Sequence, residues 1–123
     1  LVREGAAHTR GDRGMLRRAL SNLLDNALRF TPAEGEVRVT MLEDAYGVRL
    51  AVENTGDGTP APLLPRLFDR FYRADPARRE GSSEHAGLGL AITQSIVRAH
   101  GGRIFCESAA GVTKFVIELP RVN

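Results

Sequence analysis

The chain has 123 residues, which fits one domain with a core of its own but not two such domains. Its formal net charge of +2 is too small to indicate nucleic-acid binding, and no basic cluster alternates with aromatic residues. The single cysteine, Cys106, excludes an internal disulfide and a metal site built from several cysteines; we expect a small core residue there. No stretch approaches the roughly 20 apolar residues of a membrane span. Without an initiating Met or a signal peptide, we expect a cytoplasmic segment of a longer protein.

A weak alternation over residues 6–10 predicts a short edge strand, and Asp12 is a suitable N-cap for the helix that follows. The apolar residues of that helix recur at helical spacing and are predicted to share one arc: Met15, Leu16, Ala19, Leu20, Leu23, Leu24, Ala27 and Leu28. Thr31 should end the helix, because the residue before a proline is pushed out of the α region.

Residues 37–41 and 48–52 alternate with period two around a turn, which predicts a hairpin. Residues 55–86 are rich in Gly, Pro and charge, and a segment of this kind is usually an active-site lid or disordered. A helix is expected from Leu88 to about His100, stopped by two glycines, followed by strands at 103–107 and 114–119. The predicted fold is an α/β two-layer sandwich, with helices on one face of a mixed sheet of about five strands.

Two asparagines, Asn22 and Asn26, lie four residues apart in the first helix, so they stack about one turn apart on one face. A carboxamide can donate, accept or ligate a hard cation through its oxygen without carrying charge. Beside Arg29, the pair suits a magnesium-bound polyphosphate. Taken alone, it fits the solvated face of a surface helix better.

Three glycine-bearing segments, 54–58, 86–90 and 110–113, flank the expected lid. Glycine at a helix start lets backbone N–H groups approach a phosphate, which the helix dipole also favours. Each segment alone is weak support, since helices and strands often begin after glycine for conformational reasons. Neither the P-loop pattern nor the dinucleotide fingerprint is present.

In this order and spacing the chain resembles the ATP-binding catalytic domain of bacterial sensor histidine kinases, which have the Bergerat fold of the GHKL superfamily. The resemblance covers essentially residues 1–123, with a lid at about 55–86. Residues 22–32 resemble the N box, 54–58 the first glycine box, 67–73 the F box and 87–92 the second glycine box. The run 65–76 is similar to heavy-metal-sensing members.

The resemblance implies a role for each matching residue. Asn26 would coordinate Mg²⁺ on the ATP phosphates with Asn22 beside it, Arg29 would contact phosphate, and Phe30 would lie near the nucleotide. Asn22 and Arg29 are thus the expected catalytic positions.

On the base side, Asn54 would read adenine, with Gly56 and Gly58 shaping the pocket around it. The phosphate-facing backbone would come from Gly87, Leu88 and Gly89, and Thr113 would close the pocket. Phe68 and Phe71 would pack the lid against the body or against partner helices.

The sequence departs from the commoner family pattern at Asn54, which replaces an aspartate but can still accept from the adenine amino group. Thr59, His85 and Val112 also replace commoner residues. These changes leave open a degenerate ATP-binding or scaffolding module without kinase activity.

The related ATPases carry a glutamate as general base one turn before the metal-binding asparagine, where this chain has Asn22. The Asn22 amide cannot accept a proton, and Asp25, the nearest acid, is expected to face solvent. The sequence therefore favours phosphoryl transfer over the ATP hydrolysis of a GHKL-type ATPase.

The expected acceptor is a histidine on the separate helical dimerisation domain of the same sensor, and a response regulator would act downstream. His8, His85 and His100 do not suit that role. The resemblance implies a homodimeric inner-membrane sensor whose cytoplasmic part includes this domain. The fragment itself should be monomeric, with no nucleic-acid partner.

Overall fold

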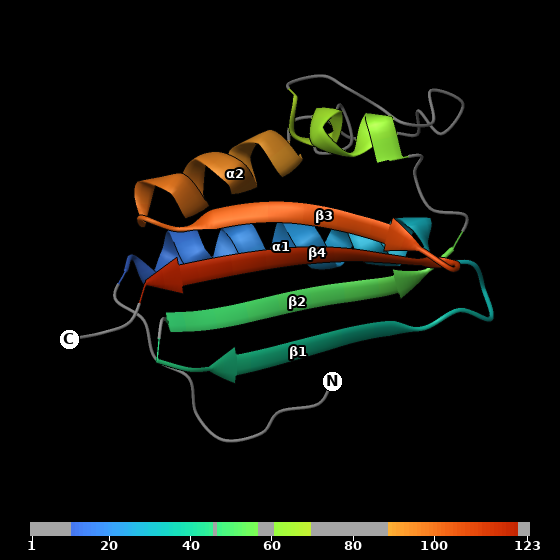
Figure 1. The fold of residues 1–123 in the computed structure, drawn as a ribbon, viewed down its shortest axis with the longest axis horizontal. Coiled ribbons are helices and arrows are strands. Elements are labelled where there is room, and N and C mark those ends of the chain that lie inside the picture. Colours follow the sequence, from blue (N-terminus) through green and yellow to red (C-terminus); the bar gives the residue numbers. More distant parts are fainter. Residues whose placement is uncertain (1–10, 46, 57–60, 70–88, 121–123) are drawn as a thin grey trace.

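The computed structural model describes residues 11–45, 47–56, 61–69 and 89–120. The elements in chain order are α1 (Arg13–Phe30), β1 (Val37–Glu43), β2 (Gly47–Thr55), the 3-10 helix η1 (Ala61–Phe68), α2 (Gly89–Ala99), β3 (Arg103–Ala109) and β4 (Val112–Pro120). The four strands form one sheet in the order β1-β2-β4-β3, with the helices packed against it (Figure 1). The predicted α/β sandwich is confirmed. No helix among the described residues is long and apolar enough to cross a membrane.

The sheet differs in detail from the expectation of about five mixed strands. All three pairings among the described strands are antiparallel. The short edge strand expected at residues 6–10 lies outside the described residues and stays a prediction. The four other expected strands are present, and each extends beyond its predicted range because ladder pairing continues past the alternating segment.

Helix α1 begins and ends as its sequence predicts. Asp12 is the N-cap, and its carboxylate accepts a 2.9 Å hydrogen bond from the Met15 N–H. Thr31 is the C-cap with extended backbone angles, as expected of the residue before a proline.

The predicted apolar arc of α1 is too wide. Ala19, Leu23 and Ala27 are buried, but Met15 is 44% exposed and Leu28 is 66% exposed. Leu28 lies about 100° around the helix from Ala27. The narrower buried stripe is the part that faces the sheet and α2 at once.

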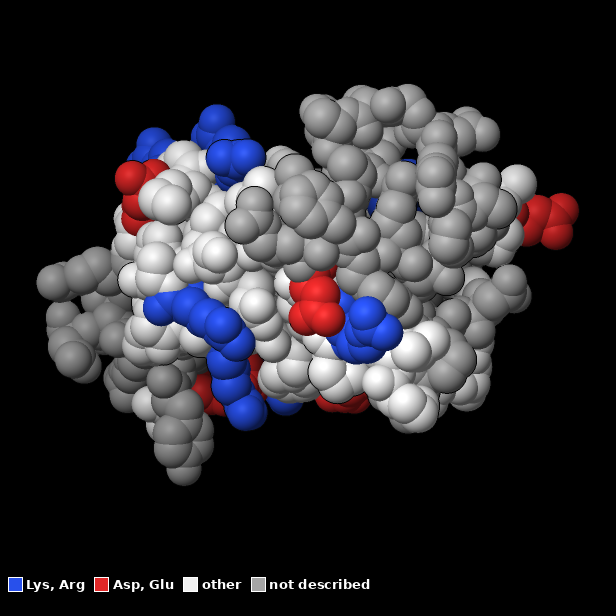
Figure 2. Space-filling model, turned by 90° about the horizontal axis from the view of Figure 1, so that it is seen from above, with Lys and Arg blue, Asp and Glu red and all other residues white. Residues whose placement is uncertain are grey.

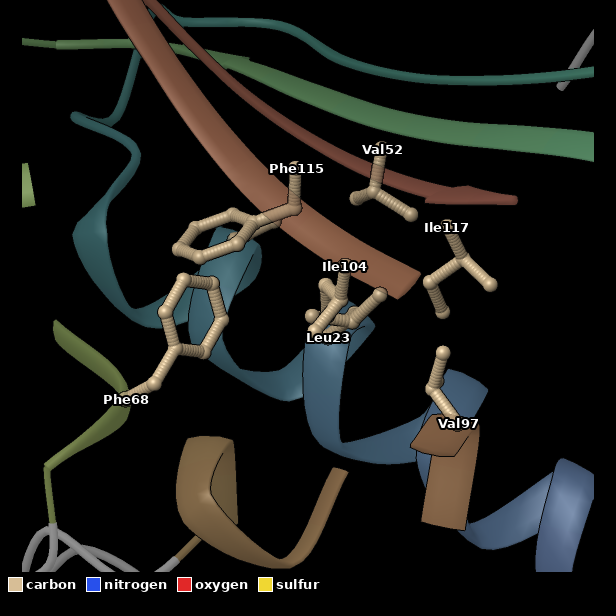
Figure 3. Close-up of a cluster of buried hydrophobic side chains, with 8 residues drawn as sticks. Leu23, Val52, Phe68, Val97, Ile104, Phe115 and Ile117 are labelled. Atoms are coloured by element: carbon tan, nitrogen blue, oxygen red, sulfur yellow. The ribbon is translucent and has the colours of Figure 1, made fainter. Parts of the chain in front are cut away.

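The core lies between the sheet and the helices. It is built from one face of the strands together with residues of all three helices: Leu23, Ala27, Val52, Phe68, Val97, Ile104, Phe115 and Ile117 (Figure 3). The register places Val52 opposite Phe115 and Leu50 opposite Ile117, so the alternating apolar residues of β2 and β4 share this face. The charged residues of the same strands therefore point to the opposite face.

Part of the expected lid is ordered on the core. Helix η1 packs against β3 and α2, and Phe68 at its end is buried. The Phe68 ring meets the Phe115 ring edge to face, with centroids 6.0 Å apart (Figure 3). This confirms packing of Phe68 against the body. Phe71 and residues 70–86 of the expected lid lie outside the described residues.

The two helices run antiparallel and are joined at the start of α1 by His100. Its Nε2 accepts from the Asp12 N–H at 3.0 Å, while Nδ1 lies 2.8 Å from the Ile96 carbonyl oxygen. The structural role expected for His100 is confirmed. Gly101, with a φ of 76°, then ends α2 in a conformation that other residues adopt at a cost.

Cys106 packs against the core from β3, as expected for a small apolar residue. Burial, and secondarily the charge of Glu107, raises the pKa of the Cys106 thiol to about 12. The reactive thiolate is therefore scarce at neutral pH.

Truncating Phe68→Ala should lower the free energy of unfolding by about 3 kcal/mol, because it removes a buried ring and leaves a cavity beside Phe115. Chemical denaturation measures this change. Leu28→Ala, at a 66% exposed position, is the matched control and should cost less than ~0.5 kcal/mol. Equal losses in both variants would contradict the anchoring role of Phe68.

Alkylation of Cys106 at pH 8 should be on the order of 1,000-fold slower in the folded chain than in denaturant, because a pKa of about 12 removes most of the thiolate. The rate should increase as the pH rises toward 12. With one cysteine in the chain, the reaction can be followed by mass. Equal rates in the folded and unfolded chain would disprove the raised pKa.

Candidate nucleotide-binding site

Asn54 and Thr113 are paired directly across β2 and β4, on the face that carries the helices. Asn54 is two residues beyond core residue Val52, and Thr113 is two before Phe115, so both side chains share the core face. The Asn54 side chain is buried, with 5% exposed. Its Nδ2 donates to the Thr55 carbonyl oxygen at 3.1 Å, which makes Oδ1 the atom that can accept from a ligand.

The end of α1 lies close to the Asn54–Thr113 pair at the first glycine segment, residues 54–58. The Gly56 N–H donates to the Gly111 carbonyl oxygen at 3.0 Å, which joins the end of β2 to the β3–β4 turn. A Cβ added at Gly56 would lie 3.3 Å from the Phe30 carbonyl oxygen. Glycine at this position therefore permits the close approach of α1, β2 and the β3–β4 turn.

The loop between α1 and β1 is fixed to the same corner. The Glu36 N–H donates to Thr55 Oγ1 at 2.9 Å, and the Thr55 N–H donates to the Glu36 carbonyl oxygen at 3.0 Å. A Cβ at Gly35 would lie 2.5 Å from Thr55 Oγ1, too close to be accommodated without movement. The wall beside Asn54 is thus held by both backbone and side-chain hydrogen bonds.

The asparagine face of α1 is directed to the start of α2. Asn22 Nδ2 donates to the Gly89 carbonyl oxygen at 3.2 Å, across 67 residues of sequence. Asn26, one turn further along α1, is half-buried. The alternative of a merely solvated helix face is therefore wrong for Asn22, because its amide binds a second helix.

Arg29 and Phe30 lie at the end of α1, beyond the asparagine pair. The Arg29 guanidinium carbon is 4.8 Å from the centroid of the Phe30 ring, and both side chains are half-buried. Such stacking can hold a guanidinium at one place while its N–H groups remain directed outward.

The structure brings several predicted site residues together at two places. Asn54, Gly56, Thr113 and Phe30 meet at the end of the sheet, and Asn22 meets Gly89. Three others lie outside the described residues: Gly58, Gly87 and Leu88. Their places in the site stay predictions.

Thr93 of α2 was not predicted from the sequence. It is fully buried, and its Oγ1 donates to the same Gly89 carbonyl oxygen at 2.9 Å. The sequence does place this hydroxyl residue among the apolar residues of the second helix, and that feature could have marked it as a buried polar residue.

The described residues contain no group of three or more His, Cys, Asp or Glu that could hold a metal ion. Mg²⁺ commonly retains waters and binds through substrate phosphates with one or two protein oxygens. The half-buried amide of Asn26 fits this kind of site, in which the protein supplies one or two oxygens and the nucleotide supplies most of the other ligands.

Charge is distributed in small groups over the described surface. On the face drawn in Figure 2, Lys and Arg side chains lie in several separate groups rather than in one continuous band. On the sheet face opposite the helices, Glu118 pairs with both Arg49 and Arg103, and Lys114 pairs with Glu53. These ion pairs neutralise that face locally.

Comparison with known proteins identifies the relatives of the chain. The sequence model of the family described as histidine kinase-, DNA gyrase B- and HSP90-like ATPase matches residues 11–123. The sensor histidine kinase CusS of Escherichia coli K12 is 52% identical over 110 residues, which cover 89% of this chain and 23% of CusS.

Solved structures agree in fold. A mycobacterial sensor histidine kinase, MprB, has a TM-score of 0.80 and 35% identity, over 92% of this chain and 77% of that one. Full-length ShkA in complex with AMPPNP has a TM-score of 0.75 and 34% identity, over 89% of this chain and 22% of that one. The chain thus spans less than a quarter of the length of CusS and of ShkA.

Proposed function

Because the chain belongs to the histidine kinase-, DNA gyrase B- and HSP90-like ATPase family, we propose that it binds Mg-ATP and transfers the γ-phosphoryl group to a histidine. The acceptor histidine would lie on the dimerisation domain of the same two-component sensor kinase. The observation that carries this proposal is the hydrogen bond from the Asn22 amide of α1 to the Gly89 carbonyl oxygen at the start of α2.

The base side of the pocket would be formed by the end of the sheet. With its Nδ2 donating to the Thr55 carbonyl oxygen, Asn54 presents Oδ1 to an exocyclic amino group such as that of adenine. Thr113 is paired with Asn54 across β2 and β4 and would close the pocket on that side. Because Gly56 has no side chain, its backbone can lie close to the Phe30 carbonyl oxygen at the end of α1.

The phosphate side would be formed by α1 and the beginning of α2. The first N–H groups of a helix have no intrahelical acceptor and attract anions. Arg29 adds a positive charge at the end of α1, and Asn26 supplies an amide oxygen. Asn26 would help to hold Mg²⁺, which would supply neutralisation of the phosphate charge.

Transfer rather than hydrolysis is favoured by the chemistry at position 22. The Asn22 amide has no basic site, and its Nδ2 already donates to the Gly89 carbonyl oxygen. Asp25, the nearest acid in α1, is exposed. No described carboxylate of α1 is thus placed to activate water where the related ATPases have their glutamate.

The second candidate is a module that binds ATP poorly and serves as a scaffold. Thr59 and His85, two of the departures that suggest it, lie outside the described residues. Val112, the third, is the first residue of β4 and pairs with Thr55 and Ala109. A β-branched residue suits a strand position, so Val112 gives this alternative little support.

The surrounding protein is proposed from the relatives. The sensor kinases that the chain resembles suggest a homodimeric membrane sensor, with this domain on the cytoplasmic side and a response regulator as the next phosphoryl acceptor.

Incubating the chain with the sensor's helical domain and labelled ATP tests the kinase activity directly. We expect label on the histidine of the helical domain, and none on this chain alone. ATP binding without label would favour the scaffold.

Replacing Asn26→Ala should lower the affinity for a non-hydrolysable ATP analogue at least about tenfold in the presence of Mg²⁺, because a ligand oxygen is lost. Without Mg²⁺ the affinity should change little. Calorimetric titration with and without the metal measures both values.

Ser21→Ala, at an exposed position of the same helix, is the control and should bind as the parent chain does. Asn26→Asp keeps a ligand oxygen and should retain the Mg²⁺ dependence. Full Mg²⁺ dependence in Asn26→Ala would show that another residue holds the metal.

A further inference from the structure

One carbonyl at the start of α2 receives side-chain donors from two helices. The Gly89 carbonyl oxygen accepts from Thr93 Oγ1 at 2.9 Å and from Asn22 Nδ2 at 3.2 Å. Thr93 is fully buried, so its hydroxyl is shielded from water. The contact therefore fixes the first peptide of α2 both to its own helix and to α1.

A hydroxyl that bonds to the carbonyl four residues earlier is common in helices and by itself says little. Two features distinguish this one. The same oxygen is bound from α1 by Asn22, which the family resemblance places beside the phosphates. The bound peptide is also the first one within α2, where the N–H groups lack helical acceptors.

The peptide group is a rigid plane in which the C=O and the following N–H point in opposite directions. Holding the Gly89 carbonyl oxygen therefore also sets the direction of the Leu90 N–H. In a helix that N–H points out of the N-terminal end, toward the space where the proposed function places the polyphosphate.

We propose that Thr93 is a positioning residue: with Asn22, its hydroxyl orients the Gly89–Leu90 peptide so that the Leu90 N–H donates to the polyphosphate of the bound nucleotide. This inference rests on the proposed function and adds a residue to it. Asn22 thereby acts through the α2 backbone.

The test compares Thr93→Val, which keeps the shape but removes the hydroxyl, with Thr93→Ser, which keeps the hydroxyl. Two ligands are titrated: a non-hydrolysable ATP analogue with Mg²⁺, and adenosine, which has no phosphates. Thr93→Val should bind the analogue about 5- to 30-fold more weakly, the size expected for one lost hydrogen bond to a functional group. Adenosine binding should stay the same, and Thr93→Ser should bind the analogue within about twofold of the parent chain.

A spectroscopic measurement observes the proposed donor itself. In the parent chain and in Thr93→Ser, the Leu90 amide proton should move downfield on addition of the analogue and not on addition of adenosine. In Thr93→Val this shift should be reduced. Removal of both donors in Asn22→Ala with Thr93→Val should cost less than the product of the two single effects, because they act on one carbonyl.

Each outcome has a defined meaning. Unchanged analogue affinity in Thr93→Val, with binding by the parent chain intact, overturns this inference and leaves the proposed function standing. An equal loss for the analogue and adenosine, with a lower melting temperature, shows a purely structural hydroxyl and also overturns it. Absence of analogue binding by the parent chain overturns the proposed function and this inference together.

Discussion

The antiparallel pairing of β2 with β4 is the constraint on which the rest of the structure depends. These strands are the two central strands of the four that are described, and they join the β1–β2 hairpin to the β3–β4 hairpin. One register sets Val52 against Phe115 in the core and Asn54 against Thr113 in the candidate site. A shift of one residue would turn both the apolar residues and Asn54 to the opposite face. Core and site are therefore specified together.

The helix pair depends on contacts at two well-separated places along it. Near the start of α1, His100 accepts the Asp12 N–H; further along, Asn22 donates to the Gly89 carbonyl oxygen. Between them lie buried residues of both helices, among them Ala19 and Val97. Because both polar contacts join α1 to α2, the asparagine face of α1 keeps a fixed position relative to the first turn of α2. Phosphoryl transfer depends on such positioning more than on covalent chemistry by the protein.

Position 22 connects this architecture with the proposed reaction. An amide there can bind the Gly89 carbonyl oxygen, whereas an ionised glutamate could only accept hydrogen bonds. The residue that removes the general base thus also donates to the second helix. Asn54 also combines two roles. Its Nδ2 donates to the Thr55 carbonyl oxygen, and its Oδ1 can accept a hydrogen bond from the base, as an aspartate oxygen would.

The sequence by itself determined the local features: the Asp12 cap, the end of α1 before Pro32, the glycine stop of α2 and the alternation of the strands. These depend on neighbouring residues and backbone preferences. The motif resemblance also identified the family and named most of the residues that the structure brings together. Only the tertiary structure decided that Leu28 is exposed, that Phe68 packs on Phe115, and that Asn22 and Thr93 share the Gly89 carbonyl oxygen. Those outcomes depend on which face of each helix meets the sheet. They also depend on contacts between residues far apart in the sequence, 67 residues in the case of Asn22 and Gly89. Local periodicity encodes neither.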